Sequence, residues 1–391
     1  MISELYLLLQ ADFFIKVGWP ILTAWPVWLP VLLIWLFMNT WLTYKRREWL
    51  KNKGNILLEI KIPKDVERTP AAMEMVLEGL WEDVAGTLSD VYLKGELRDV
   101  FSLEIVSIGG EVKFFIWAFP KWKHVIEARI YGQYPGAEVV EVEDYALKVA
   151  FDPATMALSG LTTRLVKGDA YPIKTYIEFE LDKAAGKEPE EIVDPLSPIL
   201  EYLGTLKQGE QMWTQIVIQG HRKEGFQDAR VFVKRDWRDG IKTAIKDIIE
   251  KEAHIKPEKD KPPSLLGLTD EQKSVIKAIE RNSAKLAFDA MFRFVYVAPK
   301  EIEVKRTVGI IGGMRQFGSQ ALNGIRPNQF IPGINYPWED FRDIRKTENQ
   351  RTLLEAYKRR SVFNVPFKHV MGKPYVLTTE ELATIFHFPS A

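Results

Sequence analysis

Acidic and histidine side chains are the residues of this 391-residue chain whose types suit acid–base or metal chemistry. The acidic residues gather in two groups, Glu138, Glu141, Glu143 and Asp144, and Glu188, Glu190 and Glu191. Hydrolases often place two facing carboxylates at the bond they cleave, but water-exposed strand edges and linkers account for such groups equally well. The five histidines form no H-x-x-x-H pair, and the chain has no cysteine. We therefore expect no catalytic residue, no metal site, no cofactor and no enzyme activity.

Glycine-rich strings are the next feature with a possible ligand, because backbone N–H groups can cradle a phosphate. The chain contains no G-x-x-x-x-G-K-[ST] string, which is the signature of a P-loop nucleotidase. The string GIIGGM carries Gly309, Gly312 and Gly313, but no Lys-Ser or Lys-Thr pair follows it. Close packing of helices is the better interpretation of these glycines.

The balance of charge gives little support to direct binding of nucleic acid. The chain has 53 basic and 53 acidic residues, so it lacks a global basic excess. A local basic group consists of Lys234, Arg235, Arg238, Lys242 and Lys246, with Asp236, Asp239 and Asp247 interleaved. We expect any contact with nucleic acid to be indirect or weak.

A long apolar run near the N-terminus predicts a membrane-spanning helix. No charged residue occurs between Lys16 and Lys45, and a helix of about 20 apolar residues is enough to cross a hydrocarbon layer. Prolines favour a regular helix that begins near Pro26 or Pro30, which places the span at about 26–44 within an N-terminal region of residues 1–50. Side chains suited to the membrane interface lie near its two ends: Trp25, Trp28, Trp41, Tyr44, Lys45, Arg46 and Arg47.

The segments that flank this run favour a permanent anchor over a cleaved signal peptide. The preceding residues include Glu4 and Asp12 and lack a basic n-region. Five basic residues follow the run within residues 45–53, whereas only Lys16 precedes it. This asymmetry predicts a single-pass protein of the cytoplasmic membrane, with lipid as a partner, the N-terminus outside and the remainder in the cytoplasm. A buried helix of a soluble protein is the alternative.

Alternating and helical patterns predict an α+β module over residues 55–150. The expected order is a strand at 56–62, a helix from Pro70, strands at 101–108 and 111–119, a helix after Pro120 and a strand at 137–145. This β-α-β-β-α-β order is that of a ferredoxin-like module, whose helices cover one face of an antiparallel sheet. Phe115 and Trp117 would lie on the open face, where we expect contact with a partner or with the next module. Stacking of single-stranded nucleic acid on the same rings is the alternative.

A second ferredoxin-like module is expected over residues 165–391. Its predicted elements are a strand at 171–181, a helix at 195–206, strands at 210–220 and 285–299, and a helix from 301 to about 317. A charged insertion at about 221–283 predicts two helices around a Pro- and Lys-rich loop. A helix at 347–361 and a short strand at 374–378 follow without an assigned place. The fold class is therefore α+β, with two modules behind one transmembrane helix.

Several strings of this chain resemble a known family region. They are LLEIKIPKDVERTPAAMEMVLEGL, FSLEIVSIGGEVKFFI with EARIYGQYP, LEYLGTLKQGEQMWTQIVIQ, GIIGGMRQF and YVLTTEELATIFHFPSA. They are similar to the membrane-anchored N-terminal region, an uncharacterised domain, found ahead of type IV secretion- and conjugation-like ATPases of the HerA/FtsK superfamily. In those longer proteins a P-loop motor follows the last string, whereas this chain stops at Ala391.

The resemblance implies a scaffold or adaptor that holds such an ATPase, encoded separately, at the membrane. It also implies that Leu382, Ile385 and Phe386 near the C-terminus dock onto the motor, and that the chain can form a homo-oligomer. A membrane-tethered protein that binds single-stranded nucleic acid is the alternative function.

Overall fold

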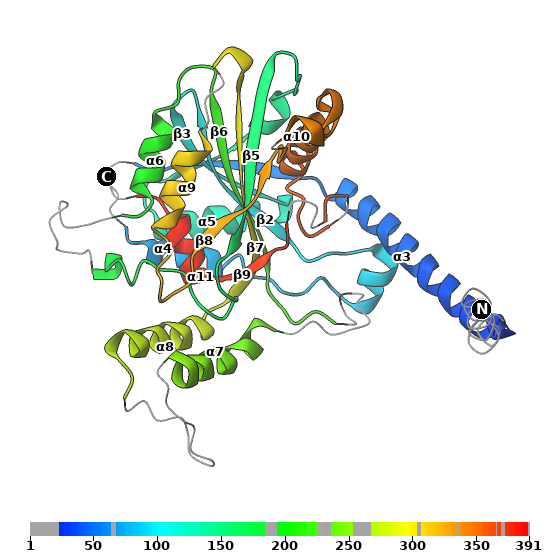
Figure 1. The fold of residues 1–391 in the computed structure, drawn as a ribbon, viewed down its shortest axis with the longest axis horizontal. Coiled ribbons are helices and arrows are strands. Elements are labelled where there is room, and N and C mark those ends of the chain that lie inside the picture. Colours follow the sequence, from blue (N-terminus) through cyan, green and yellow to red (C-terminus); the bar gives the residue numbers. More distant parts are fainter. Residues whose placement is uncertain are drawn as a thin grey trace, which may run out of the picture. The chain divides into compact units, whose positions relative to one another are not determined.

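The computed structural model of the chain describes residues 23–63, 68–183, 194–225, 228, 236–252, 267–302, 306–334, 336–364, 366–368 and 372–389 (Figure 1). The chain divides into two compact units. The first unit contains the described part of residues 1–52 together with 86–97, and the second contains 53–85 together with the described residues from 98 onward.

One long helix, α3 (Trp25–Lys53), dominates the first unit. It begins beside Pro26, as the sequence predicts, and it continues past the expected end near residue 44 to Lys53, with Pro30 inside it. In its most apolar 18-residue window only 6% of the residues are buried, and Val27, Ile34 and Phe37 are all largely exposed. The helix is long and apolar enough to span a membrane. The predicted N-terminal helix is thus confirmed, while its orientation stays a prediction.

A short segment packs against the C-terminal part of α3 within the same unit. Residues Asp90–Lys94 form a π-helical turn, and the indole Nε1 of Trp41 donates to the carbonyl of Tyr92 at 2.9 Å. Gly95 follows with a φ of +77°, and a Cβ on it would lie 2.5 Å from the backbone carbon of Lys45. Only glycine fits this contact, because it combines a left-handed conformation with no side chain.

Within the described residues, nine strands of the second unit form one sheet in which neighbouring strands are antiparallel. The order is β4-β1-β3-β2-β6-β7-β5-β8, and β9 also pairs with β7. The strands are β1 (Ile56–Lys61), β2 (Val100–Ile108), β3 (Glu111–Ala118), β4 (Glu138–Val142), β5 (Met156–Leu165), β6 (Gln211–Gly220), β7 (Ala287–Pro299), β8 (Ile325–Ile331) and β9 (Tyr375–Thr378).

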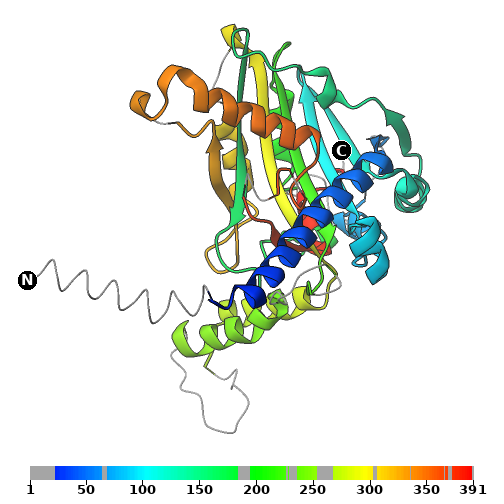
Figure 2. The same cartoon turned by 90° about the vertical axis from the view of Figure 1, so that its right-hand side faces the viewer.

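In the part of the chain that the structure describes, five helices contribute to one apolar core on a single face of this sheet (Figure 1). They are α4 (Pro70–Glu78), α5 (Lys123–Gln133), α6 (Ser197–Gly204), α9 (Thr307–Arg315) and α11 (Thr379–Ile385). Alternation along the strands supplies the facing side chains, as with Met212 and Ile216 of β6. The intervening Trp213 contacts Tyr357 of α10 (Ile344–Lys358), so α10 covers the opposite face (Figure 2).

The predicted insertion contains the helices α7 (Ile241–Asp247) and α8 (Asp270–Ser283), which lie side by side (Figure 1). They share a small apolar cluster that includes Ala244, Ile248, Val275 and Ile279. A capping box at Thr269 and Gln272 begins α8. Both helices were expected, and most of the loop predicted between them lies outside the described residues.

The strand expected at 171–181 is wrong. The segment pairs with no described strand of the sheet, and two of its backbone N–H groups bond to side chains of α11: Ile173 donates to Glu381, and Tyr176 donates to Thr384, both at 2.9 Å. The strand of this half is β5, which pairs with β7 and β8. Its sequence, MALSGLTTRL, was missed because it lacks clear alternation of apolar and polar residues.

The two expected modules share one sheet, because β2 pairs with β6 from Val100 opposite Gln219 to Ile108 opposite Gln211. The contact between β2 and β6 divides the sheet into two halves. Along the chain, the first half contributes β1, α4, β2, β3, α5 and β4, and the second half repeats this succession with β5, α6, β6, β7, α9 and β8. Strand order is β4-β1-β3-β2 in the first half and the mirrored β6-β7-β5-β8 in the second. The molecule is therefore a mixed α/β protein whose nine-stranded antiparallel sheet crosses the expected module boundary.

Candidate functional site

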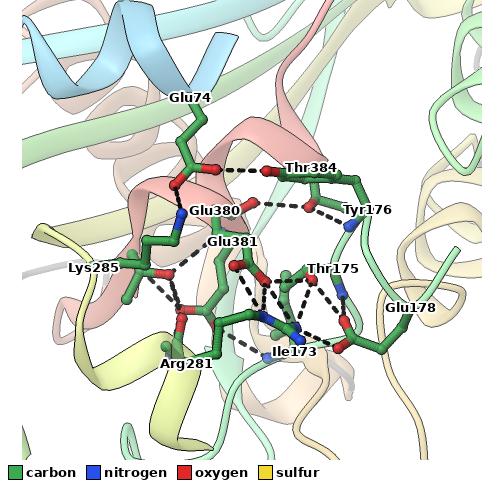
Figure 3. Close-up of polar contacts among 12 residues, drawn as sticks. Glu74, Ile173, Thr175, Tyr176, Glu178, Arg281, Lys285, Glu380, Glu381 and Thr384 are labelled. Carbon is green, nitrogen blue, oxygen red and sulfur yellow. Dashed lines mark hydrogen bonds and ion pairs between the residues drawn. The ribbon is translucent and has the colours of Figure 1, made fainter. Parts of the chain in front are cut away.

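A cluster of polar side chains surrounds α11 in the second unit (Figure 3). All seven residues of this helix are buried, including Glu380 and Glu381. A capping box begins the helix, because Thr378 accepts from the backbone of Glu381 at 3.4 Å and the Glu381 carboxylate accepts from the backbone N–H of Thr378 at 2.9 Å. This arrangement places two adjacent carboxylates at the start of the helix, where the helix dipole favours negative charge.

Arg281 of α8 is the main cation of the cluster. Its Nε lies 3.1 Å from both carboxylate oxygens of Glu380, and its Nη2 donates to Glu178. Thr175 lies between these two carboxylates, with its hydroxyl 2.6 Å from Glu178 and 2.7 Å from Glu380. Burial lowers the pKa of Arg281, but its bonds to Glu178 and Glu380 outweigh that effect and raise the pKa above its ordinary value. The guanidinium stays charged and joins α8 to α11.

Glu74 of α4 forms the other end of the cluster (Figure 3). Its carboxylate accepts from the Tyr176 hydroxyl at 2.7 Å and from the Thr379 hydroxyl at 3.1 Å. The Lys285 ammonium, just beyond α8, lies 2.7 Å from the same carboxylate. Burial and the bond to Glu74 raise the pKa of Tyr176, so its hydroxyl remains a donor. Glu74 therefore links α4 to the segment at 173–178 and to the end of α8.

Glu381 is the carboxyl group of this cluster whose pKa is raised into the neutral range. Burial raises its pKa to about 7, despite bonds from Ile173, Thr378 and Asn282 that favour the charged form. The group is fully enclosed, whereas Glu178 and Arg281 are partly exposed. It thus titrates near neutrality inside the joint between α8 and α11.

The contacts of this cluster are of the kind that hold structural elements together. Its carboxylates are satisfied by two cations, hydroxyls and backbone N–H groups, which is how buried charges are tolerated in proteins. Among the described residues, no group of three His, Cys, Asp or Glu side chains could hold a metal ion. The cluster instead connects four segments far apart in sequence, namely α4, residues 173–178, α8 and α11.

A hollow of about 520 Å³ lies on the opposite face of the sheet, lined by Phe115, Tyr145, Lys113, Lys148 and Gln211 among others. Phe115 was expected on an open face, but it is buried against Tyr145, with ring centroids 5.2 Å apart. Trp117 is buried as well, with the Arg360 guanidinium 5.8 Å from its ring centre. Both rings are covered by the chain itself, so the expected contact with a partner is wrong for these side chains, whereas the contact of Trp117 with Arg360 agrees with the alternative of packing against the next module.

A buried ion pair explains why Arg360 covers this face. Arg360 Nε donates to Glu104 of β2 at 2.9 Å, and both side chains are fully buried. Burial alone would raise the pKa of Glu104, but the Arg360 guanidinium holds it below its ordinary value. The Tyr145 hydroxyl, 2.7 Å from Glu104, extends the same network. The end of α10 is therefore fixed to the centre of the sheet.

The residues expected to dock onto a motor, Leu382, Ile385 and Phe386, are buried in the apolar core. Phe386 packs against Phe114 of β3, with ring centroids 5.9 Å apart. A docking surface at these side chains is thus a wrong expectation, because α11 fills the space between α4 and the sheet. The helix contacts its own molecule on every side.

The predicted membrane-interface residues all lie in α3. Trp25, Trp28 and Tyr44 are exposed, as is Arg47. Trp41 is half-buried by its contact with Tyr92. Lys45 is half-buried too, paired with Glu48 at 2.8 Å and close to the Tyr44 ring, and Arg46 is also half-buried. The basic flank continues the helix instead of ending it.

Four residues of the cluster were not predicted from the sequence: Glu74, Thr175, Arg281 and Glu380. Each lies 99 residues or more from the next along the chain, so no local pattern joins them. One local signal was present. The string TTEE matches the S/T-x-x-E capping box that precedes an apolar run, and it predicts a helix start with two carboxylates at 380 and 381. The partners of those carboxylates have no comparable signature.

A comparison with protein families finds a matching family model. A model described as a domain of unknown function (DUF8128) matches residues 38–391, from the middle of α3 to the last residue. No curated protein matches the chain. Since the family match covers nearly the whole sequence, the protein belongs to the DUF8128 family of domains of unknown function.

Proposed function

We propose that the protein is a membrane-anchored, non-catalytic scaffold or adaptor of a type IV secretion- or DNA-transfer-like apparatus, which holds a HerA/FtsK-type P-loop ATPase at the membrane. The exposed apolar surface of α3 is the observation that carries this proposal. Burial of a large apolar side chain is worth about 1.5–3 kcal/mol, so a helix with many such exposed groups is strongly favoured in lipid over water.

The second unit supports the scaffold part of the proposal. The strings that resemble the family region coincide with β1 and α4, β2 and β3, α6 and β6, α9, and β9 with α11. These elements build the sheet and its helical layer. Helix α11 is fastened to α8 by the Arg281–Glu380 pair and to α4 by the bond from Thr379 to Glu74, which suits a part that transmits position instead of converting substrate.

The finer features of the proposal concern topology and fold. Lys45, Arg46 and Arg47 at the end of the apolar run favour the cytoplasm for the second unit and the outside for the N-terminus. We also propose that each half of the sheet descends from one ferredoxin-like unit, since the strand order β4-β1-β3-β2 and its mirrored counterpart both fit that arrangement.

Single-strand binding through Phe115 and Trp117 has lost its main support. Proteins that bind single strands stack bases on accessible aromatic rings. Both rings are buried against the chain itself. We therefore carry only the scaffold function forward.

Co-purification tests the proposal. The full chain is expressed with a HerA/FtsK-type ATPase encoded beside it, extracted in mild detergent and captured through a tag. We expect the ATPase to be retained, and retained equally by a chain whose apolar run at 26–44 is replaced by an unrelated spanning helix. Recovery of the chain from membranes without the ATPase would contradict the adaptor role, and recovery in the soluble fraction would contradict the anchor.

A further inference from the structure

We propose that Leu88 and Leu93 make a second contact with lipid, beside α3, at the boundary between the hydrocarbon layer and the headgroups. Both belong to residues 86–97, which we call the flanking segment and which form one compact unit with α3. The inference rests on the proposed anchoring by α3. It assigns a lipid-binding role to a segment that follows β1 and α4 in the sequence.

Exposure along α3 shows where the protein begins to cover the helix. Every residue from 23 to 40 is exposed except Leu29 and Met38, which are half-buried, whereas Leu42 is buried. Counted from Trp25, the residues up to 40 rise roughly 24 Å at 1.5 Å per residue, in a hydrocarbon layer about 30 Å thick. With α3 across the bilayer, the edge of that layer lies within the next helical turn, at about residues 41–44.

The flanking segment contacts α3 at this same level. The indole Nε1 of Trp41 donates to the carbonyl of Tyr92 at 2.9 Å. Gly95 lies so close to the helix that a Cβ on it would be 2.5 Å from the backbone carbon of Lys45. Both contacts lie within the first unit. The anchor therefore holds the flanking segment at the edge of the hydrocarbon layer.

Leu88 and Leu93 are apolar side chains that the flanking segment leaves uncovered. They are 47% and 61% exposed, whereas Val91 between them is 1% exposed. Removal of such side chains from water is favourable. Lipid is the apolar surrounding at this level, because α3 exposes Phe37 to more than half, one helical turn before Trp41. The exposed leucines thus continue the lipid-facing surface of the helix.

The polar groups of the turn at Asp90–Lys94 suit the membrane interface because they bond to each other. The Asp90 carboxylate accepts from the Thr87 hydroxyl at 2.6 Å and lies 2.7 Å from the Lys94 ammonium. The backbone N–H of Glu96 donates to the carbonyl of Asp90 at 3.0 Å. A carboxylate that is already paired costs less to bring to the edge of the layer than a lone charge.

The charge of the first unit beyond the apolar run favours an anionic lipid surface as the occupant. Basic side chains outnumber acidic ones there: Lys45, Arg46, Arg47, Lys51 and Lys94 against Glu48, Asp90 and Glu96. Basic residues just beyond a spanning helix are attracted to anionic headgroups. Exposed leucines beside a basic excess, at the level where the apolar run ends, are the composition of a segment that lies in the interface.

Single-cysteine labelling tests the proposal on the full chain, because the sequence has no cysteine. Leu88→Cys and Leu93→Cys carry an environment-sensitive fluorophore in vesicles of phosphatidylcholine and phosphatidylglycerol. Lys51→Cys is the control within the same unit, because it lies roughly 15 Å beyond Trp41 along α3. Leu147→Cys, where the native side chain is 66% exposed, is the control in the second unit. Leu36→Cys reports on the anchor itself.

Lipids with a spin label near the headgroup or deep in the acyl chain serve as quenchers. We expect headgroup-labelled lipid to quench positions 88 and 93 several-fold more than positions 51 and 147, and chain-labelled lipid to quench position 36. If position 36 is quenched while 88 and 93 match 51, the proposed contact is wrong and the anchor stands. Protection of 88 and 93 from a water-soluble quencher without quenching by lipid would indicate a second copy and would also overturn the proposal. Absence of quenching at 36 would refute the anchor on which it rests.

Discussion

Glu381 shows how one buried carboxyl can make the whole fold sensitive to pH. Its pKa is 4.5 ordinarily and about 7 in the folded chain, because burial disfavours the charged form. The stability it contributes is complete below 4.5 and is lost as the pH rises through about 7, because the unfolded chain releases the proton first. A shift of this size corresponds to roughly 3 kcal/mol. We expect the free energy of unfolding to fall over this range.

Replacement of Glu381 by Gln should flatten this pH dependence, since the amide stays neutral at every pH. Urea unfolding of the full chain in detergent, across the same pH range, measures it. Glu280→Gln on the exposed side of α8 is the control, and it should retain the slope. An unchanged slope in the Glu381→Gln variant would show that another group is responsible.

Arg360 and its neighbour Arg359 give a second prediction at this scale. Arg360→Ala should lower the free energy of unfolding by about 3–5 kcal/mol, because it leaves Glu104 buried without its cation. Arg359→Ala should lower the free energy of unfolding by less than about 1 kcal/mol, because Arg359 is exposed and its pairing with Glu355 at 3.5 Å is open to solvent. Denaturant unfolding compares the two. Equal costs would contradict a buried ion pair.

At the scale of elements, two glycines of the GIIGGM string pack closely against a neighbouring helix, whereas the third has open space beside it. A Cβ on Gly309 would lie 2.2 Å from the Tyr202 ring, and one on Gly313 would lie 2.5 Å from Ile199, whereas nothing lies within 4 Å of one on Gly312. Gly309→Ala and Gly313→Ala should therefore push α9 off α6 and destabilise the protein. Gly312→Ala should stabilise it by up to about 1 kcal/mol through helix propensity. Thermal unfolding of the three variants gives the order, and a uniform effect would reject it.

The same string shows what the sequence can reveal about elements. Its glycines predicted close helix packing, and the contacts of Gly309 and Gly313 with α6 confirm it. Alternation likewise located β6 and β7, because one face of each strand is apolar along its length. The segment at 171–181 alternates too, yet it joins no strand of the described sheet, and its Ile173 and Tyr176 N–H groups donate to side chains of α11. Periodicity cannot distinguish a segment that joins the sheet from one that binds α11, since the residues of α11 that bind it lie some 200 positions away in the sequence.

Arg281 should control the mobility of α11. Arg281→Gln removes the cation that lies 3.0 Å from Glu380 and keeps a polar side chain on α8. We expect faster hydrogen exchange at the amides of α11 and of residues 173–178, with β6 unchanged, because the joint opens locally. Lys277→Gln, an exposed position on the same helix, is the control. Unchanged exchange in α11 would mean that its apolar contacts alone hold it.

At the scale of the whole molecule, the sequence predicted many of the helices and strands but not how the strands of the two expected modules pair. The order of strands and helices in residues 55–150 was predictable from local patterns. The pairing of β2 with β6 was not, because an edge strand and an internal strand have the same alternation when both faces are covered. The partner of Trp117 was equally hidden, since Arg360 lies some 240 residues further along the chain, and although contact with the next module was expected, no local pattern identifies Arg360 as the residue that makes it.

The shared sheet leads to a last prediction, that both halves of the second unit unfold together. Leu58 of β1 and Phe292 of β7 belong to one continuous apolar core. Leu58→Ala should lower the free energy of unfolding by about 2–5 kcal/mol, through lost burial and the cavity left behind. In a single cooperative unit, hydrogen exchange of the slowest amides in β7 should register that same loss, although β7 lies in the other half. Val140→Ala on the edge strand β4, where the side chain is exposed, should leave β7 unchanged. If Leu58→Ala accelerates exchange only in β1 to β4, the halves are independent modules that merely share an edge.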